Sequence, residues 1–568
     1  MDRELQAMLD RLLVGADSYE VGIGVVVREL LGRMQFVETL NELLPWDEKQ
    51  CAVSPGQRLL ALVMAFVEDR RALFRIPEVY ARRDVELLLG EGVQPEQLND
   101  KALARALDKL HAADAKRVYS TICLRAVEAY GVTMQRLHAD TTSVSVYGAY
   151  DGEPHSGLEI TYGFSKDHRP DLKQFKLGAT VTEDGIPIAG DVFNGNEADQ
   201  MWNQKLLDWL DGWLSREKRG ETLLCADSAL VTTDNLERLS SDGFLFVSRL
   251  PHSFAWADIA RAEALHGPED LWQDVGQLAP GKNKARYRLR ETSGDIGGRT
   301  YRLIVVHSSS LSDRKGHSLL HQAEKEQEAI ERTGRKLERQ TWSCREDAEA
   351  ALGEAISELD PRFWDTRQRV EAEVWEPPRR RGRPAKGETR PESTIVYRAH
   401  LELGQRRDDE LRDAQRWHST FILITNDWKR TPKELFMAYR GQATVEGAFR
   451  WLKGPVRTSP VFLKKPERVE AFGYVMLMAY LVYALVQRAV RSALPPGEKL
   501  EVEGRKTDRP TAQVVLDVIA HAKVLHVQVP GERLRRILLA PSPKIRRIME
   551  LLEIPADAFL TLPYHNSA

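Results

Sequence analysis

Two aspartates stand at points where a buried strand is expected to meet polar sequence. Asp140 follows an apolar stretch expected to form a strand (residues 132–137) and precedes three hydroxyl residues, and Asp227 follows the apolar run LLCA at 223–226. Ligand sites in α/β sheets gather at the carboxyl ends of strands. Either aspartate could instead be a turn or helix-capping residue. Asp191 is a weaker rival because it lies inside its own expected strand.

A third acid, Glu446, lies on a predicted helix. The sequence TPKE at 431–434 is a capping box with proline at the first helical position, so a helix is expected to begin there. Polar residues seven apart, and those at the steps between, share one helical face. The members of this polar stripe are Tyr439, Gln442, Glu446, Arg450 and Lys453. This stripe suits a catalytic helix on a sheet, or else an ordinary solvated face of a helix. Gly441 lowers the stability of the helix at that position and favours a kink there.

The chain carries a basic field around Glu446 although its overall charge is small. Its 81 Lys and Arg against 84 Asp and Glu give −3, so a surface for a polyanion must be local. Residues 429–469 hold ten basic and three acidic residues, Arg440 among the former, which gives +7. A second basic stretch contains Arg381 and Arg383 in the sequence RGRP, which fits either an arginine hook for a DNA minor groove or a plain basic loop. Cations that hold a polyanion beside carboxylates that hold a metal suit phosphodiester chemistry.

Several other chemistries are disfavoured by missing motifs. The sequence has no GxxxxGK[ST] loop, no GxGxxG after a strand, no HExxH and no GxSxG. The 14 histidines do not cluster at metal-ligand spacing, and the four cysteines lie far apart without a CxxC pair. The sequence therefore argues against ATP-driven, zinc-dependent and serine-hydrolase functions, and against a disulfide scaffold.

The elements that must position the acids change in pattern along the chain. Residues 1–125 show helical apolar spacing, which predicts a helical N-terminal domain. Residues 126–251 show three successive strand patterns, then a helix, a strand, a helix and a strand, which predicts a mixed sheet flanked by helices. Polar helical stretches and two strand candidates predict an inserted α+β subdomain at 252–418. The core resumes at 419–495, and the tail at 496–568 is expected to be mostly helical.

One apolar segment is long enough to raise the question of a membrane. Residues 471–486 carry no charge for 16 positions. A lone membrane span usually needs about 20 apolar residues, so this one is short. A core helix buried on all sides is favoured over a membrane segment.

Taken together, the motifs resemble those of bacterial insertion-sequence transposases of the DDE class, whose ribonuclease H-like core carries an insertion before the final catalytic helix. Members show Tyr, two residues, Arg, three residues, Glu, six residues and Lys on that helix. Here the sequence is YRGQATVEGAFRWLK at 439–453, with Gln442 in the position of the usual Arg. The sequences LHADTTS at 137–143 and LCADS at 224–228 resemble the motifs of the first two acids. The resemblance covers about residues 130–490.

The resemblance implies a metal-dependent DNA transposase. Asp140, Asp227 and Glu446 would be catalytic and would hold two Mg²⁺ ions, for which Mn²⁺ could substitute. The expected DNA-binding residues are Tyr439, Arg440, Gln442, Arg450, Lys453, Arg381 and Arg383. The enzyme would cleave the inverted-repeat ends of a transposon and join them to target DNA by a cut-and-paste route. It would act as a homodimer in a synaptic complex, without a membrane, in the bacterial cytoplasm beside the nucleoid.

Two alternatives remain open at the level of sequence. A non-transposing Mg²⁺-dependent nuclease would share the three acids, and a DNA-binding protein with an inactive core would share the fold. Hairpin-forming relatives stack a displaced base on an aromatic residue of the insertion. The candidates here are Trp342, Trp375 and Trp417, and the sequence does not choose among them.

Overall fold

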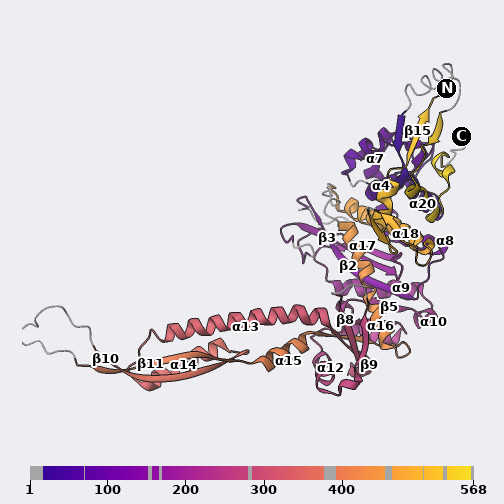
Figure 1. Ribbon diagram of the computed structural model, residues 1–568. Helices are drawn as coiled ribbons and strands as arrows, with labels where there is room; N and C mark the ends of the chain where they lie inside the picture. The colour runs from indigo at the N-terminus through magenta and orange to yellow at the C-terminus, as the bar shows by residue number, and fades with distance from the viewer. Residues whose placement is uncertain are drawn as a thin grey trace, which may run out of the picture. The chain divides into compact units, whose positions relative to one another are not determined.

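The computed structural model describes residues 17–68, 71–150, 157–165, 169–278, 284–376, 392–453, 463–502, 504–528 and 534–563 (Figure 1). The chain forms two compact units. The first unit combines Met1–Ser248 with Glu434–Ala568, and the second is Arg249–Lys433. The predicted insertion at 252–418 falls within the second unit.

The first unit is built around a mixed sheet whose strands lie in the order β4-β3-β2-β5-β6. The strands are β2 (Arg136–Val146), β3 (Lys173–Thr182), β4 (Pro187–Asn194), β5 (Leu223–Ala226) and β6 (Leu245–Arg249). The first three pair antiparallel, whereas β5 runs parallel to both β2 and β6. This order confirms the predicted ribonuclease H-like mixed sheet.

Helices cover both faces of this sheet. On one face, Trp202 of α9 (Asp199–Trp213) packs against Gly178 of β3. On the other face, α8 (Ala115–Ala129) and α18 (Pro466–Ala493) bring Tyr119 and Leu477 against Gly190 of β4. Because both faces are covered, β3 and β4 are buried almost along their whole length. α11 (Thr233–Ser241) connects β5 to β6.

The N-terminal helices share one hydrophobic core with α18 and the C-terminal region. They are α2 (Gly22–Gly32), α3 (Phe36–Leu43), α4 (Pro55–Glu68), α5 (Ile76–Tyr80), α6 (Val85–Leu89) and α7 (Asp100–Ala112). A capping box starts α4: Gln57 N donates to Ser54 Oγ at 3.1 Å, and Ser54 N donates to Gln57 Oε1 at 2.8 Å. The helical character predicted for this region is confirmed.

The two ends of the chain are joined by a small sheet that the sequence did not predict. β1 (Asp17–Glu20) pairs with β15 (Lys523–Val527), which pairs with β16 (Arg535–Leu538). Asp84 supports this junction by accepting hydrogen bonds of 2.6 Å from both His526 Nε2 and Arg536 Nε. Burial alone would raise the pKa of Asp84, but the hydrogen bonds from His526 and Arg536 outweigh it and lower the pKa to about 2.

The C-terminal region holds more strand than the sequence indicated. Besides β15 and β16 it contains a short hairpin and two helices within the described residues. These are β13 (Leu500–Val502), β14 (Arg505–Thr507), α19 (Ala512–Ile519) and α20 (Pro543–Leu551). The apolar residues of α19 and α20 join the core around α18.

The long helix α18 is long and apolar enough to cross a membrane by length and composition alone. Its most apolar window has a mean hydropathy of 1.8, and 89% of that window is buried inside the fold. Tyr480 at its centre donates a 2.7 Å hydrogen bond to Gly185 O. The prediction of a core helix is confirmed, because protein rather than lipid covers this surface.

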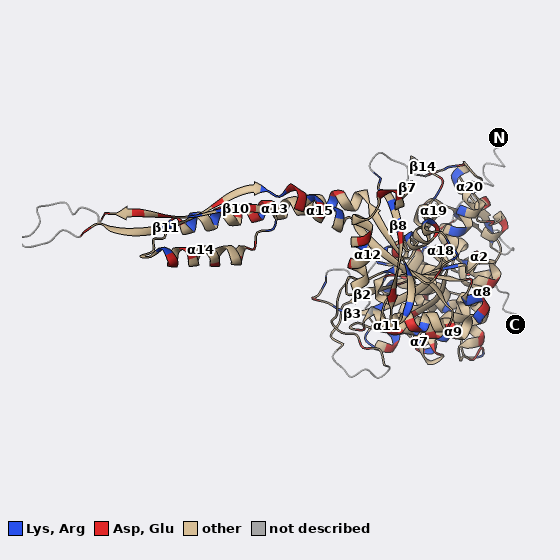
Figure 2. Ribbon diagram, turned by 90° about the horizontal axis from the view of Figure 1, so that it is seen from below, with Lys and Arg blue, Asp and Glu red and all other residues tan. Residues whose placement is uncertain are grey.

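The second unit contains four neighbouring antiparallel strands and a long hairpin. These strands lie in the order β12-β9-β8-β7. The strands are β7 (Gln273–Gln277), β8 (Arg286–Ile296), β9 (Arg299–Ser308) and β12 (Thr420–Thr425). The hairpin of β10 (Trp364–Trp375) and β11 (Thr394–Arg406) packs against α13 (Ser309–Leu337) and α14 (Arg345–Leu359). Basic and acidic residues are interspersed along these helices (Figure 2). The remaining helices are α12 (Ala255–His266) and α15 (Asp408–His418).

Candidate active site

Asp140 and Asp227 lie side by side on neighbouring parallel strands. β2 and β5 pair in register up to Ala139 and Ala226, so the next residues on the two strands are the two aspartates. Parallel neighbours are roughly 4.8 Å apart and residues in register point to the same face. Asp227 keeps an extended backbone, with φ −72° and ψ 179°. The sheet therefore presents both carboxylates together, on one face.

The local setting of Asp140 differs from the one that the sequence predicted. The expected strand ended before Asp140, but β2 continues to Val146, and Thr141 pairs with Gly178 of β3. Because β3 offers a long antiparallel partner, the hydroxyl residues after Asp140 join the ladder instead of forming a turn. Asp140 is thus a mid-strand residue, whereas Asp227 follows the end of β5 as predicted.

Backbone amides hold both carboxylates. Thr141 N donates to Asp140 Oδ1 at 2.8 Å, and Ala229 N donates to Asp227 Oδ1 at 3.0 Å. Ser248 Oγ donates at 2.6 Å to Asp227 O, which fixes the backbone of that residue to β6. Amide donors of this kind favour the ionised carboxylate, which is the form that binds cations.

The helix that carries Glu446 is broken at Gly441, where the sequence favoured a kink within one helix. α16 (Pro432–Arg440) ends before a turn at Gly441 and Gln442, and α17 (Ala443–Lys453) begins after it. The prediction that one helical face carries the polar residues from Tyr439 to Lys453 is therefore wrong. Tyr439 lies on α16, whereas Lys453 lies on α17. Gly441 is the reason: a Cβ atom there would lie 2.5 Å from His138 Cε1. Only glycine permits this close approach to β2.

Gln442 fastens the start of α17 to the strand that carries Asp140. Its Nε2 donates a 2.8 Å hydrogen bond to Ala139 O, and the side chain is buried. The interior position does not fit the direct DNA contact that the sequence predicted for Gln442. His138 lies two residues before Asp140 and so on the same face of β2. Burial, with the nearby Arg136 cation, lowers the pKa of His138 to about 4, so the imidazole is neutral at pH 7.

The remaining polar residues of α17 lie beyond this attachment. Glu446 and Arg450 are exposed, one and two turns after Gln442, and Lys453 is half-buried. On the preceding helix, Arg440 is exposed and Tyr439 half-buried. The apolar side of α17, with Val445 and Leu452, enters the core of the first unit.

The three acids do not form a closed metal site as they stand. Within the described ranges, no group of three His, Cys, Asp or Glu side chains lies close enough to hold a metal ion. The donor set is nevertheless of the right chemistry, because carboxylate oxygens are the hard ligands that Mg²⁺ prefers. Asp191 is not a competitor: it accepts from Lys116 Nζ at 2.7 Å and from Tyr474 Oη at 2.9 Å within the core.

Sequence reasoning missed two residues of this site. It did not single out His138, and it assigned Gln442 to DNA. The available signal was the spacing of His138 and Asp140, since residues two apart on a strand share a face.

Other predicted residues lie elsewhere. Arg381 and Arg383 fall outside the described residues. Among the tryptophans of the insertion, Trp342 packs against a small core of the second unit and Trp417 lies 4.9 Å beneath the Arg261 guanidinium. Trp375, at the end of β10, is 47% exposed.

The strand order, the helices on both faces and the paired aspartates on the two central parallel strands define the class of ribonuclease H-like enzymes. A family model described as a transposase DDE domain matches residues 134–482, which is more than half of the chain. A second model, described as a domain of unknown function (DUF4277), matches residues 16–124. No curated protein matches the chain.

The chain belongs to the DDE transposase family. It is a DNA transposase, an enzyme that cleaves DNA and transfers strands, and DNA is its partner. Enzymes of this family generally use divalent metal ions. Action on DNA suggests a cytoplasmic protein. Nothing in the comparisons favours a non-transposing nuclease or an inactive DNA-binding protein.

Proposed function

We propose that Asp140, Asp227 and Glu446 are the catalytic carboxylates of this transposase and that they bind two Mg²⁺ ions, with Mn²⁺ able to substitute. The observation that carries the proposal is the register of β2 and β5, which puts Asp140 beside Asp227. The bond from Gln442 to Ala139 O supports the inclusion of Glu446, because it holds the start of α17 one residue from Asp140.

The metal ions would supply activation of water or of a DNA 3′-hydroxyl and stabilisation of the leaving oxygen. The residues of the chain position the reactants. Asp140 and Asp227 lie on neighbouring strands of the sheet or directly after them, whereas Glu446 is exposed on α17. His138 is neutral at pH 7, so it adds no cation that would compete with a metal for the two aspartates.

The DNA contacts follow from the basic field of the chain around α17. We assign phosphate contacts to Tyr439, Arg440, Arg450 and Lys453. Gln442 is assigned a positioning role through Ala139 instead of a DNA contact. Arg381 and Arg383 stay candidates for a minor-groove contact, and they lie outside the described residues.

The wider reaction follows from family membership. The enzyme would nick the inverted-repeat ends of its own element and join the 3′-hydroxyl to target DNA, a cut-and-paste route. Both ends must be held together for this, so we expect a homodimer in a synaptic complex that works at the nucleoid.

Substitution of Asp140 tests the proposal. Asp140→Ala is expected to abolish strand cleavage on DNA that carries the element's termini, while binding of those termini in EDTA stays near the wild-type level. Asp234→Ala removes an exposed carboxylate at the start of α11 and serves as the control. An Asp140→Ala enzyme that still cleaves would exclude Asp140 from the site.

A further inference from the structure

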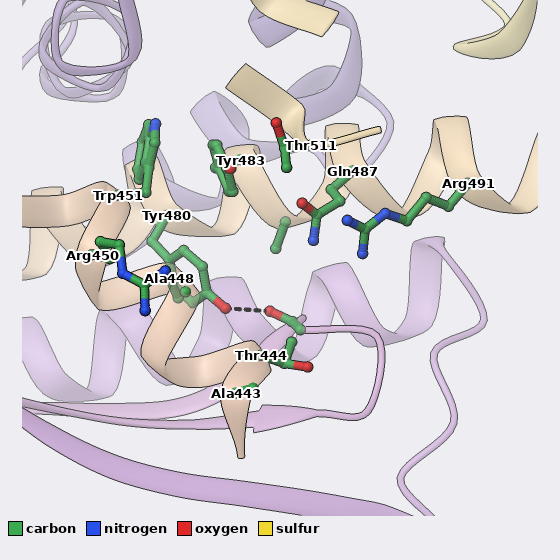
Figure 3. Close-up of a pocket in the computed structure, with 13 residues that line it drawn as sticks. Ala443, Thr444, Ala448, Arg450, Trp451, Tyr480, Tyr483, Gln487, Arg491 and Thr511 are labelled. Atoms are coloured by element: carbon green, nitrogen blue, oxygen red, sulfur yellow. Dashed lines mark hydrogen bonds between the residues drawn. The ribbon is translucent and has the colours of Figure 1, made fainter. Parts of the chain in front are cut away.

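A pocket of about 450 Å³ lies on the flank of α17 that faces α18 (Figure 3). Its walls come from α17 between Ala443 and Trp451, the second half of α18, the turn at Gly185 and the residue before α19. The hydrogen bond from Tyr480 to Gly185 O joins two of these walls. Glu446 is not among the residues that line it, so the pocket is separate from the carboxylates.

The lining of this pocket is positively charged. It contains two guanidinium groups, Arg450 and Arg491, and no aspartate or glutamate. Among the described residues, Arg450 has neither a hydrogen-bond nor an ion-pair partner. Arg491 uses its Nε to donate to Pro510 O at 2.9 Å and likewise forms no ion pair in the described part of the chain. Burial is the largest cause that lowers the pKa of Arg491; Arg509 lowers it further, whereas Tyr483 and Asp184 raise it.

Neutral donors add to the two cations. Thr511 precedes α19 and lines the pocket, and its hydroxyl does not cap that helix. The N-terminal end of a helix attracts anions. Gln487 also lines the pocket, and its amide forms no hydrogen bond with any other described residue.

The size and shape of the pocket indicate a ligand larger than one phosphate. Arg450 stands at one end and Arg491 at the other, with Tyr480 and Thr444 between them (Figure 3). Behind them the rings of Trp451 and Tyr483 pack at 4.4 Å between centroids and form an apolar wall. A volume of about 450 Å³ is in the range of pockets that bind small organic ligands.

We propose that this pocket binds a stretch of single DNA strand, with one phosphate at Arg450, the next at Arg491, and the nucleoside between them against the aromatic wall. Arg450 follows Glu446 by four residues on α17, so a strand that leaves the carboxylates along this helix meets the pocket within one turn. The subsite depends on the action of the chain on DNA but not on the assignment of the three carboxylates.

The salt dependence of DNA binding tests the subsite. Affinity of the full chain for a labelled oligothymidylate is measured by fluorescence anisotropy in EDTA at several salt concentrations. Each phosphate contact contributes about 0.7 to the slope of log affinity against log salt for a single strand. Arg450→Gln and Arg491→Gln should each reduce the slope by about that amount, and the double variant by about twice as much. Arg491→Lys keeps the positive charge and should therefore keep the wild-type slope, which separates an effect of charge from an effect on folding. Arg216→Gln on α10 (Arg216–Arg219) is the control and should leave the slope unchanged.

Occlusion provides a second test that leaves the charges unchanged. A Cβ at Gly447 would meet nothing within 4 Å, so Gly447→Leu puts its side chain into the pocket. It should weaken oligothymidylate binding about tenfold, whereas Gly212→Leu, an equally open site on α9, should not. Unchanged slopes in both arginine variants would overturn the proposal. The proposal would also be overturned if inorganic phosphate or thymidine monophosphate competed with the oligothymidylate as strongly as a dinucleotide with two phosphates does. Because EDTA removes any metal, this outcome is independent of the Asp140→Ala result.

Discussion

The side-chain amide of Gln442 donates a 2.8 Å hydrogen bond to the backbone oxygen of Ala139, the residue directly before Asp140. This bond joins two segments about 300 residues apart in the chain, the first-acid strand and the helix of the third acid. Since α17 begins at Ala443, a shift of Gln442 displaces the whole helix and Glu446 with it. Gln442 therefore acts on the site through position.

Substitution of Gln442 should lower activity without loss of DNA binding. Gln442→Leu keeps the volume but removes the donor, which costs about 1 kcal/mol of stability. A misplacement of about 1 Å in a catalytic group can cost roughly 10²-fold in rate, so cleavage should fall at least about tenfold. The metal concentration for half-maximal cleavage should rise, while affinity for DNA in EDTA stays unchanged. A loss of affinity in EDTA would instead support the direct DNA contact.

Gly441 should tolerate no side chain. An alanine Cβ would lie 2.5 Å and 2.7 Å from two atoms of the His138 ring, which is itself buried. The overlap should cost about 1–3 kcal/mol and displace α17, despite the better helix propensity of alanine. Gly212→Ala on α9 has open space and should gain about 1 kcal/mol. Thermal unfolding of both variants, with cleavage rates, checks this. If Gly441→Ala and Gly212→Ala unfold at the same temperature, the space between Gly441 and β2 is large enough for a side chain.

The sequence predicted the local features of this fold better than its long-range ones. The succession of strands and helices in the core and the buried helix α18 follow from apolar periodicity, which depends on neighbouring residues. Three features escaped it: the extension of β2 past Asp140, the close approach of Gly441 to His138, and the pairing of β1 with β15. Each feature depends on a partner that is distant in the sequence. The partner is β3 for the extension of β2, His138 for Gly441 and the C-terminal strand β15 for β1. For the same reason the residue types suggested the three acids, but only the register of β2 and β5 brings two of them together.

A thiolate in place of Asp227 should change the metal preference of the enzyme. Asp227→Cys replaces a hard oxygen by a soft sulfur, which Mg²⁺ binds poorly. We expect cleavage to be lost in Mg²⁺ and partly restored in Mn²⁺, which accepts softer ligands. The cleavage assay in the two metals, with Asp227→Ala as the variant that neither metal restores, makes the comparison. If Asp227→Cys cleaves DNA no better in Mn²⁺ than Asp227→Ala does, residue 227 does not contact the metal directly.

Glu470 makes the stability of the first unit depend on pH. Its side chain on α18 is 23% exposed, and burial, with Asp191, Asp114 and Glu467 nearby, raises the pKa of this carboxyl to about 7. The unfolded chain releases this proton near pH 4.5, so between about pH 4.5 and 7 the folded state holds more protons. The free energy of unfolding should therefore fall as pH rises through that window, by at most about 3 kcal/mol.

Replacement of Glu470 by glutamine should remove this dependence. Glu470→Gln carries no charge at any pH, so above about pH 7 it should be more stable than the wild type. The gain is reduced by the lost contact with His111, whose Nδ1 lies 3.5 Å from Glu470 Oε2. Chemical unfolding between about pH 5 and pH 8 measures the slope, with Glu237→Gln on α11 as a control that should keep the wild-type slope. A Glu470→Gln chain that loses stability with rising pH as steeply as the wild type would place the titrating group elsewhere.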